Sequence, residues 1–407
     1  MPTTPRVIVA HMGARHGYAV PRILHQRGAL SRLYTDLSAK GVVASAAAAW
    51  PMRFDLPVVG KLRRRTVKGI PPSMVYSAPM VNMRSALATG KTQQERYAIE
   101  NRLFGAQMQR WGVGDANIVY GMYGSGVPFW RHAKSQGLKI VVDMFITPLH
   151  HRIMVEESRR NPGWDDQVQL SEDDCLLIDR TIAEMIDVAD LLLCPSSTVV
   201  QGLASMAKTL PTRIAVLPRA VVVPYGAELR SQLPAKPVPG HVLFAGGVEL
   251  RKGIPYLAKA AEIASQSDVR TQYRVAGQAG EKLRAHPDAR HLTFLGHLSR
   301  EALISEYLSA DVFALPTLAE GSAGVVFEAM AAGIPVVTTH SAGSVITHGK
   351  EGLIVPERDG LAVARAVEKI VKDRALRDAM SREALKTASA NDECQWGDRL
   401  FNVLASL

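Results

Sequence analysis

The sequence predicts an α/β protein made of two doubly wound domains that face a central cleft. Short apolar runs of strand length alternate along the chain with helix-forming stretches, which is typical of parallel sheets covered by helices. The chain has 407 residues, more than one hydrophobic core usually supports, so two domains are expected. A proline-rich segment, 224–240, separates two series of apolar runs and is the expected hinge.

The elements follow from these runs in order. In the first series the expected strands are 6–12, 117–121, 138–144, 190–195 and 213–217, and a long helix is expected over 172–188. In the second series the expected strands are 242–246, 271–276, 291–295, 311–315, 334–338 and 352–355. The resulting division is 1–225, 226–390 and a last helical segment, 391–407. Because ligands of doubly wound sheets bind beyond the carboxyl ends of the strands, the loops after these strands should line the cleft.

Composition excludes several classes of protein. About half of the residues, 47%, are hydrophobic, so the chain can bury large cores. No apolar run approaches the roughly 18 to 20 residues needed to span a bilayer, and the first residues resemble an opening strand rather than a signal peptide. The cysteines are Cys175, Cys194 and Cys394, an odd and widely spaced set that favours a reducing cytoplasm and indicates neither a metal site nor a disulfide framework.

The stretch 315–337 carries the strongest functional signal. It reads as a strand, a loop, a helix that ends at Gly333 and Pro335, and a second strand. Unpaired amides at the start of such a helix bind anions such as phosphate. Glu320 and Glu328 flank the loop, and carboxylates prefer hydroxyl partners to phosphate. A phosphate-binding loop between two hydroxyl-binding acids indicates a nucleotide sugar.

The same residues resemble a known family. The pattern Glu320-x7-Glu328 within 316–338 looks like the signature of retaining glycosyltransferases of family 4, which have the GT-B fold with two Rossmann-like domains. The further matching segments are 242–247, 251–257, 294–298, 310–313 and 349–356 with Asp359. They follow in the family's order, so the resemblance is good from about residue 185 to the end and weak before it.

The resemblance implies roles for the matching residues. Glu320 would lie near the donor-sugar hydroxyls as a catalytic residue, Glu328 would bind the ribose and Lys252 the diphosphate. Many members have an arginine where this chain has Gly247, and we expect Arg251 to supply that second charge. The remaining expected donor-binding residues are Gly277, Leu298, Gly321, Ser322, Ala323, Gly324 and Val325. Ser322 and Ala323 replace the family's usual Phe-Gly, which leaves room for the backbone to approach the sugar.

The N-terminal domain is expected to bind the acceptor. Gly13, His16 and Gly17 follow the first strand, where they could accept phosphate or hydroxyl groups. Tyr123 precedes a glycine-rich loop whose composition favours a tight turn over a binding loop. The first of these loops is not the GxGxxG of dinucleotide-binding proteins. His150 lies where many family members place a histidine near the reacting sugar, and His151 is the competing choice. The resemblance also implies that the last helix returns to the N-terminal domain.

The resemblance implies front-face displacement, in which the departing phosphate helps to deprotonate the acceptor hydroxyl. We therefore expect no general base, no metal and no cofactor apart from the nucleotide-diphosphate sugar, of UDP or GDP type, as co-substrate. The expected activity is transfer of a sugar to a glycan or lipid-linked acceptor in polysaccharide or glycolipid biosynthesis.

The formal net charge of +10 points to an anionic partner. Six basic residues are interleaved with apolar ones in 50–68, a pattern that predicts peripheral contact with the inner face of an anionic membrane, although Pro57 and Gly60 favour an ordinary surface segment. No nucleic-acid motif is present. Two other functions remain open, a catalytically inactive GT-B protein that binds nucleotide or glycan as a scaffold or sensor, and a nucleotide-dependent dehydrogenase.

Overall fold

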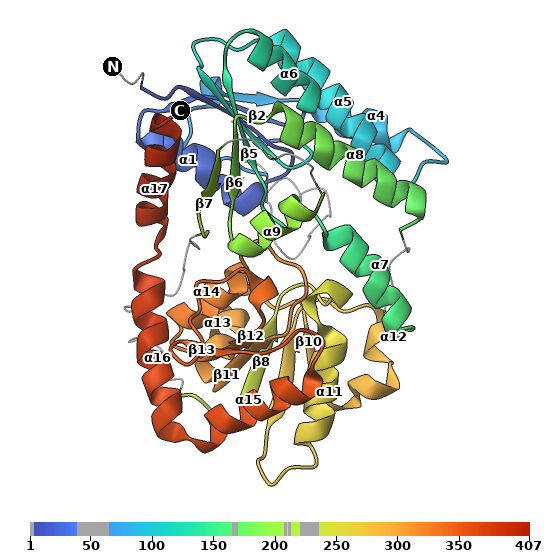
Figure 1. Ribbon diagram of the computed structural model, residues 1–407, viewed down its shortest axis with the longest axis vertical. Coiled ribbons are helices and arrows are strands. Elements are labelled where there is room, and N and C mark those ends of the chain that lie inside the picture. The colour runs from blue at the N-terminus through green and yellow to red at the C-terminus, as the bar shows by residue number, and fades with distance from the viewer. Residues whose placement is uncertain (1–3, 39–64, 165–169, 207–209, 211–212, 220–235) are drawn as a thin grey trace, which may run out of the picture.

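The computed structural model describes residues 4–38, 65–164, 170–206, 210, 213–219 and 236–407. These ranges form two α/β halves that lie one above the other along the longest axis of the molecule (Figure 1). Each half contains a parallel sheet, so the predicted fold class is confirmed. Most of the expected hinge, 224–235, lies outside the described residues, as does the part of the basic segment from 50 to 64.

The N-terminal sheet has seven strands in the described residues, in the order β3-β2-β1-β4-β5-β6-β7. They are β1 (Val7–Ala10), β2 (Leu30–Thr35), β3 (Val75–Ser77), β4 (Ile118–Met122), β5 (Lys139–Asp143), β6 (Leu191–Cys194) and β7 (Ile214–Val216). The chain continues from β1 to one side and later returns to pair β4 on the other side. A doubly wound sheet binds ligands at this switch point, beyond the carboxyl ends of β1 and β4.

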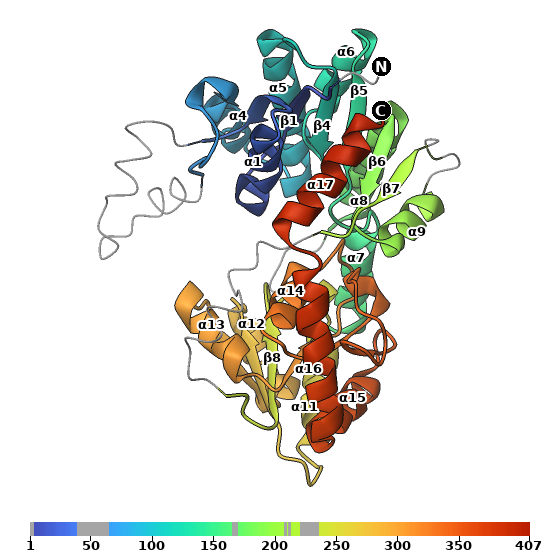
Figure 2. The ribbon, with the colours of Figure 1, turned by 90° about the vertical axis from the view of Figure 1, so that its left-hand side faces the viewer.

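Helices cover both faces of this sheet (Figures 1 and 2). The α-helices are α1 (Ala19–Gln26), α4 (Pro79–Ala86), α5 (Gln93–Trp111), α6 (Val127–Ser135), α7 (His150–Arg160), α8 (Glu172–Val188) and α9 (Ser197–Met206), with short 3-10 helices η1 (Arg15–Tyr18) and η3 (Pro72–Met74). Capping boxes begin α5 at Thr92 and α8 at Ser171. The Thr92 hydroxyl also donates to Asp174 at 2.7 Å, which joins the starts of the two helices. The α8 range is the one expected from the sequence.

The C-terminal sheet has six strands in the described residues, in the order β10-β9-β8-β11-β12-β13. They are β8 (His241–Ala245), β9 (Gln272–Ala276), β10 (Leu292–Gly296), β11 (Val312–Leu315), β12 (Val336–Thr338) and β13 (Gly352–Ile354). The helices are η4 (Leu250–Lys252), α11 (Ile254–Ala264), α12 (Glu281–Arg284), η5 (Pro287–His291), α13 (Arg300–Ser309), α14 (Gly324–Ala331), η6 (His340–Ala342), α15 (Gly360–Lys372), α16 (Arg374–Ser389) and α17 (Glu393–Ala405). All six expected strands of this half are confirmed to within two residues at each end.

Two strands of the N-terminal half were not expected. β2 contains Ser31 and Arg32, which interrupt the apolar run, and β3 is a three-residue strand at the edge of the sheet. Arg32 is nevertheless well placed, because its guanidinium donates to the Trp111 carbonyl at 2.7 Å and lies over the Tyr76 ring. Tertiary contacts of this kind override a weak local pattern.

Segments from each half of the chain complete the other half. Trp164, just after α7, is buried in the C-terminal core and packs against His286, with the two rings tilted and their centroids 4.4 Å apart. At the other end, α16 and α17 run from the lower half to the upper half (Figure 1). Trp396 and Leu400 of α17 are buried in the N-terminal core beside α1. No helix in the described ranges is both long enough and apolar enough to cross a bilayer.

Candidate functional site at the cleft between the domains

The turn after β8 carries two neighbouring cations, Arg251, which lines the cleft cavity described below, and Lys252, which is buried beside it. Gly253 ends η4 with φ of 74°, and a Cβ atom there would lie 1.9 Å from the Pro316 carbonyl oxygen, so only glycine fits. The close approach joins the β8 turn to the β11 loop. It brings Arg251 and Lys252 of η4 against the loop that carries Glu320.

Glu320 holds both cations through one carboxylate oxygen. Its Oε1 accepts from Arg251 Nη1 at 2.8 Å and from Lys252 Nζ at 2.5 Å. All three side chains are less than one-fifth exposed. Burial alone would lower the pKa of Arg251, but the carboxylates of Glu320 and Glu249 outweigh burial and raise it, so the guanidinium stays charged. The cluster therefore holds two cations close together, and the carboxylates of Glu320 and Glu249 neutralise them.

Glu328, on the first turns of α14, has a different environment. Burial raises the pKa of its carboxyl group, and the Tyr307 hydroxyl donates to Oε2 at 2.9 Å. Tyr307 belongs to α13 and is fully buried, so it fixes the direction in which the carboxylate points. Tyr307 was missed from the sequence because it resembles any apolar helix residue.

A cavity of about 580 Å³ opens between the two domains. Its walls are formed by Gly13, Ala14, Arg15, Phe145, Ile146, Arg219, Arg251, Glu320, Ser322 and Gly324. Gly324 begins α14, and the preceding N-cap residue, Ala323, has no side-chain oxygen to cap the helix. The Ser322 hydroxyl is buried without a hydrogen-bond partner in the described structure. The cavity therefore combines guanidinium groups, an uncapped helix start and an unused hydroxyl.

The other expected donor-binding residues, Lys252 and Glu328 included, are not among the residues that line the cleft cavity. A Cβ atom on Gly321 would lie 2.0 Å from the Phe145 carbonyl oxygen, and Ser196 donates to the Gly321 carbonyl at 2.6 Å, so Gly321 joins the two domains. A Cβ atom on Gly277 would lie 1.8 Å from the Gly246 carbonyl oxygen. Gly247 lies in the turn after β8, and Leu298 and Val325 pack against the core. The amide of Ala323 is already bonded to the Ala342 carbonyl.

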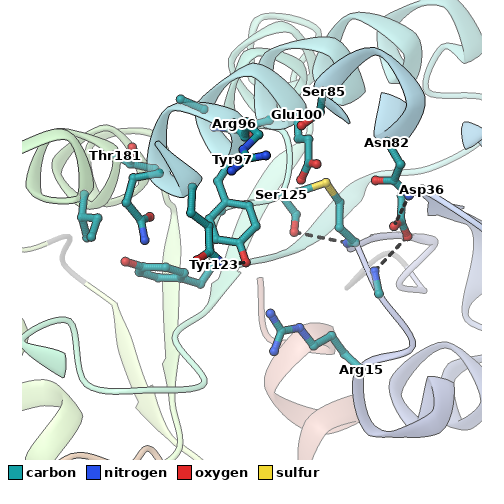
Figure 3. Close-up of a pocket in the computed structure, with 18 of the residues that line it drawn as sticks. Arg15, Asp36, Asn82, Ser85, Arg96, Tyr97, Glu100, Tyr123, Ser125 and Thr181 are labelled. Carbon is teal, nitrogen blue, oxygen red and sulfur yellow. Dashed lines mark hydrogen bonds between the residues drawn. The ribbon is translucent and has the colours of Figure 1, made fainter. Parts of the chain in front are cut away.

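A second cavity, of about 730 Å³, opens in the N-terminal domain at the switch point of its sheet, and we call it the N-terminal cavity (Figure 3). Tyr123 and Ser125 after β4, Arg15 after β1, and Tyr97 and Gln93 of α5 lie on its walls. These are aromatic and hydrogen-bonding side chains, which suit sugar rings and their hydroxyls. Gly13, Arg15, Phe145 and Ile146 line both cavities, so the two spaces adjoin.

The structure distinguishes the two candidate histidines. His150 lines the N-terminal cavity, and its Nδ1 lies 3.0 Å from the Thr147 carbonyl. Burial, with a smaller effect of His151, lowers the pKa of His150 to about 4. Since a carbonyl accepts only from a protonated nitrogen, Nδ1 carries the hydrogen and Nε2 is left as an acceptor. His151 is 1% exposed and contacts Asp179 at 2.9 Å, away from that cavity's lining.

The loop after β1 differs in detail from expectation. The Gly13 amide donates to Asp36 Oδ1 at 2.9 Å, and the Gly17 amide donates to the Ala14 carbonyl. Neither amide is therefore available to a ligand, although Gly13 lines both cavities. The backbone of His16 lies in η1. The cavity-lining side chain that this loop supplies is instead Arg15.

Asp143 and Arg219 form a buried pair beneath the cleft. Asp143 accepts two bonds from Arg219 Nη2, at 2.7 and 2.8 Å, and one from the Tyr120 hydroxyl at 2.6 Å. Arg219 also lines the cleft cavity. No local pattern in the sequence marks Arg219, because its role depends on a partner 76 residues away. In the described part of the chain, no three His, Cys, Asp or Glu side chains cluster as a metal site would require.

Comparison with known proteins identifies the C-terminal half. Residues 239–373 match the model of the family described as glycosyl transferases group 1. We call the part of the C-terminal domain that matches this family the group 1 domain. This match contains the β8 turn, Glu320 and Glu328. The group 1 domain therefore supplies the cation cluster, whereas the N-terminal cavity lies outside the matched residues.

Curated relatives share part of this chain. It is 36% identical over 85 residues to a capsular polysaccharide biosynthesis glycosyltransferase, CapM, of Staphylococcus aureus, covering 20% of this chain and 22% of that one. It is 31% identical over 172 residues to a phosphatidyl-myo-inositol mannosyltransferase of Mycobacterium leprae, covering 39% and 46%. The matches span less than half of the length of these relatives.

The structural similarity covers more of the chain than the sequence matches do. A structure of Anabaena Alr3699/HepE in complex with UDP and glucose superposes with a TM-score of 0.62 at 15% identity, covering 99% of this chain and all of that one. At this identity the likeness concerns the fold alone. The chain therefore has the GT-B fold, with the group 1 domain as its second half.

Proposed function

We propose that this protein is a retaining glycosyltransferase that moves a sugar from a nucleotide-diphosphate sugar to a glycan or lipid-linked acceptor in polysaccharide or glycolipid biosynthesis. One observation carries the proposal. Arg251, Lys252 and Glu320 of the group 1 domain form a cluster of charged side chains at a cleft, and the cleft adjoins a large cavity of the other domain. The charged leaving group would bind at the cluster, and the hydroxylated acceptor would bind in the adjoining cavity.

The cluster can perform the electrostatic part of transfer. Departure of a nucleoside diphosphate builds negative charge on its phosphate oxygens, and fixed cations with helix-start amides stabilise that charge. Arg251, Lys252 and the start of α14 are such groups. Glu320 would then turn to the hydroxyls of the donor sugar, and Glu328, directed by Tyr307, would bind the ribose hydroxyls.

On the acceptor side, neutral His150 offers Nε2 to a sugar hydroxyl near the reacting carbon. With a pKa of about 4 it would be a weak base, which fits a mechanism in which the departing phosphate takes the acceptor proton. We propose transfer with retention by front-face displacement, without a metal ion or another cofactor. Similarity to a capsular polysaccharide biosynthesis glycosyltransferase and to a phosphatidyl-myo-inositol mannosyltransferase supports a glycan or lipid-linked acceptor.

A lipid-linked acceptor would place the protein in the cytoplasm, in peripheral contact with the inner face of the membrane, and the basic segment 50–68 is proposed to make that contact. Sedimentation with vesicles that contain about 30% phosphatidylglycerol tests this part. Binding should fall as salt rises and should be lost when the arginines at 63 to 65 are replaced by glutamine. Absence of binding to these vesicles at low salt would remove the membrane contact from the proposal.

The function itself is tested by a thermal-shift panel of UDP, GDP and ADP and their common sugars, with and without EDTA. We expect one nucleoside diphosphate family to raise Tm of the full chain, equally in both conditions, and Lys252→Ala to abolish the shift. Consumption of a sugar nucleotide only in the presence of an added acceptor would support the proposed transferase activity. Stabilisation without turnover would favour a catalytically inactive scaffold or sensor, and a response to NAD alone would favour a dehydrogenase.

A further inference from the structure

The junction of the two cavities contains an arginine that no carboxylate of the described residues pairs with. Arg15 lines both the cleft cavity and the N-terminal cavity. Its guanidinium carbon lies 4.4 Å from the centre of the Phe145 ring. Figure 3 shows the side chain extending from the loop after β1 along the edge of the N-terminal cavity. In the described part of the chain it makes no ion pair with Asp or Glu.

The other arginines of the cleft cavity do have carboxylate partners. Arg219 is bonded to Asp143 at 2.7 Å, and Arg251 is bonded to Glu320 at 2.8 Å. Each of these carboxylates is already shared, Asp143 with Tyr120 and Glu320 with Lys252. Both carboxylates are therefore already bonded to other side chains. Among the described arginines that line the cleft cavity, Arg15 is the one without a carboxylate partner.

The surroundings of Arg15 make an anion favourable there. The side chain is open to the solvent of the cavities, yet enough protein surrounds it that burial lowers its pKa, and the charge of Arg219 lowers it further. A guanidinium keeps its charge in proteins. An anionic ligand group would relieve the repulsion between the two arginines and could accept two parallel hydrogen bonds from Arg15.

We propose that the acceptor carries an anionic group, a phosphate or a carboxylate, which Arg15 binds at the junction while the rest of the acceptor lies in the N-terminal cavity. This inference rests on the proposed function and names the acceptor class. The hydroxyl-binding walls of Tyr97, Tyr123 and Ser125 then face the neutral part of the acceptor. The donor diphosphate has its own cations in Arg251 and Lys252, which belong to the other domain.

Arg96 provides a matched control. It lies on α5, lines the same cavity, and no described residue forms an ion pair with it. Figure 3 shows Arg96 and Glu100 together on the wall opposite Arg15. Arg96 is four residues before Glu100 on the same helix, so its charge has an acid nearby. Arg96→Gln removes the same charge from the cavity at a different place.

The experiment uses the full chain saturated with the nucleoside diphosphate that stabilises it, so that the donor site is filled. Methyl phosphate, which presents an anion without a sugar, is titrated and followed by ³¹P NMR, with glucose 6-phosphate and glucose as a second, matched pair. We expect methyl phosphate to bind and glucose 6-phosphate to bind at least tenfold more tightly than glucose. Arg15→Gln should weaken both anions about 10- to 100-fold, Arg15→Lys less, and Arg96→Gln less than twofold.

The proposal is overturned if methyl phosphate does not bind to the saturated protein, or if Arg15→Gln and Arg96→Gln weaken it equally. It is also overturned if Arg15→Gln weakens the nucleoside diphosphate itself tenfold, because Arg15 would then serve the donor. Failure of the proposed function is seen separately, as the lack of stabilisation by any nucleoside diphosphate. Circular dichroism and Tm of each variant show whether it is folded.

Discussion

Glu320 and Lys252 are joined by a hydrogen bond of 2.5 Å between the carboxylate Oε1 and Nζ, and the same oxygen accepts from Arg251. The acid that is proposed to bind the donor sugar thus occupies the cations that are proposed to bind its diphosphate. Donor binding must exchange one anion for the other. The cleft stays neutralised before the donor arrives, which avoids leaving two cations unpaired.

Glu320→Gln should therefore tighten the binding of the nucleoside diphosphate alone, by about tenfold or ~1.4 kcal/mol, because the competing carboxylate is gone. Transfer should nevertheless be lost, since the donor sugar loses its acid. Isothermal titration calorimetry and a turnover assay measure the two effects. Glu249→Gln is the control, because Glu249 bonds Arg251 but not Lys252 and should have a smaller effect. Weaker diphosphate binding in Glu320→Gln would contradict competition between the two anions.

Glu328→Gln should separate stability from binding. The folded pKa of Glu328 lies above its ordinary value of 4.5, so the unfolded chain ionises first as pH rises. The buried carboxyl group therefore costs stability above pH 4.5 and costs none well below it. Glu328→Gln should raise Tm at pH 7 but not at pH 4, while donor binding falls by about 1 to 3 kcal/mol through the lost hydroxyl contacts.

Tyr307→Phe is the companion variant for Glu328. It should weaken donor binding less than Glu328→Gln does, since the carboxylate remains but is no longer held in one direction. Calorimetric titration of both variants with the same nucleotide ranks the two losses. If Tyr307→Phe bound the nucleotide as weakly as Glu328→Gln while keeping the wild-type Tm, the expected order would be wrong. The orientation that Tyr307 gives the carboxylate would then account for all of the contribution of Glu328 to donor binding.

His150→Gln keeps an acceptor close to the position of Nε2 but loses the ring, and it should lower kcat about tenfold with little change in donor affinity. The lowered pKa of about 4 also affects stability. As pH falls from about 6.5 to 4 the unfolded chain gains a proton at this residue that the folded chain does not, so stability falls over this range. Urea unfolding between pH 7 and 4.5 should show a shallower loss for His150→Gln than for the wild type. An identical slope in both proteins would exclude His150 as its source.

Glu157 and Arg358 join the two domains through a buried carboxylate. Glu157 is fully buried on α7 and accepts from Arg358 Nε and from the Tyr256 hydroxyl, both at 2.6 Å. Arg358→Met should destabilise the protein by about 2 kcal/mol, because a buried charge loses its partner. The double variant Glu157→Gln with Arg358→Met should recover part of this loss. Chemical denaturation of Arg358→Met, Glu157→Gln and the double variant measures the coupling free energy between the two side chains. Additive changes in the free energy of unfolding would show that the two are not coupled.

Much of the C-terminal half could be predicted because its local signals agree with its fold. All six strands are short apolar runs, and Gly333 ends α14 with φ of 69° after Ala332, as its sequence suggests. The approximate place of the loop proposed to bind phosphate follows from the same residues. The local sequence pattern and the tertiary structure favour the same elements there, so the sequence alone predicts most of this half.

The parts that could not be predicted depend on distant contacts. β2 is polar in places because Arg32 reaches the end of α5, and β3 is too short to produce an alternating pattern. Arg219 donates to Asp143, and Tyr307 donates to Glu328. The choice between His150 and His151 likewise required knowing that Asp179 lies opposite only one of them. None of these pairings leaves a regular spacing in the chain.

The reciprocal placement of Trp164 and α17 limits how this chain can be recombined with a relative. A cut in the linker would leave the first half without Trp396 and Leu400 in its core, and the second half without Trp164. A chimera that borrows the donor half of a relative must therefore take α7 through Trp164 with the second half and return α17 to the first. A domain swap in such a protein therefore has to move three separate segments of the chain and not one contiguous stretch of the gene.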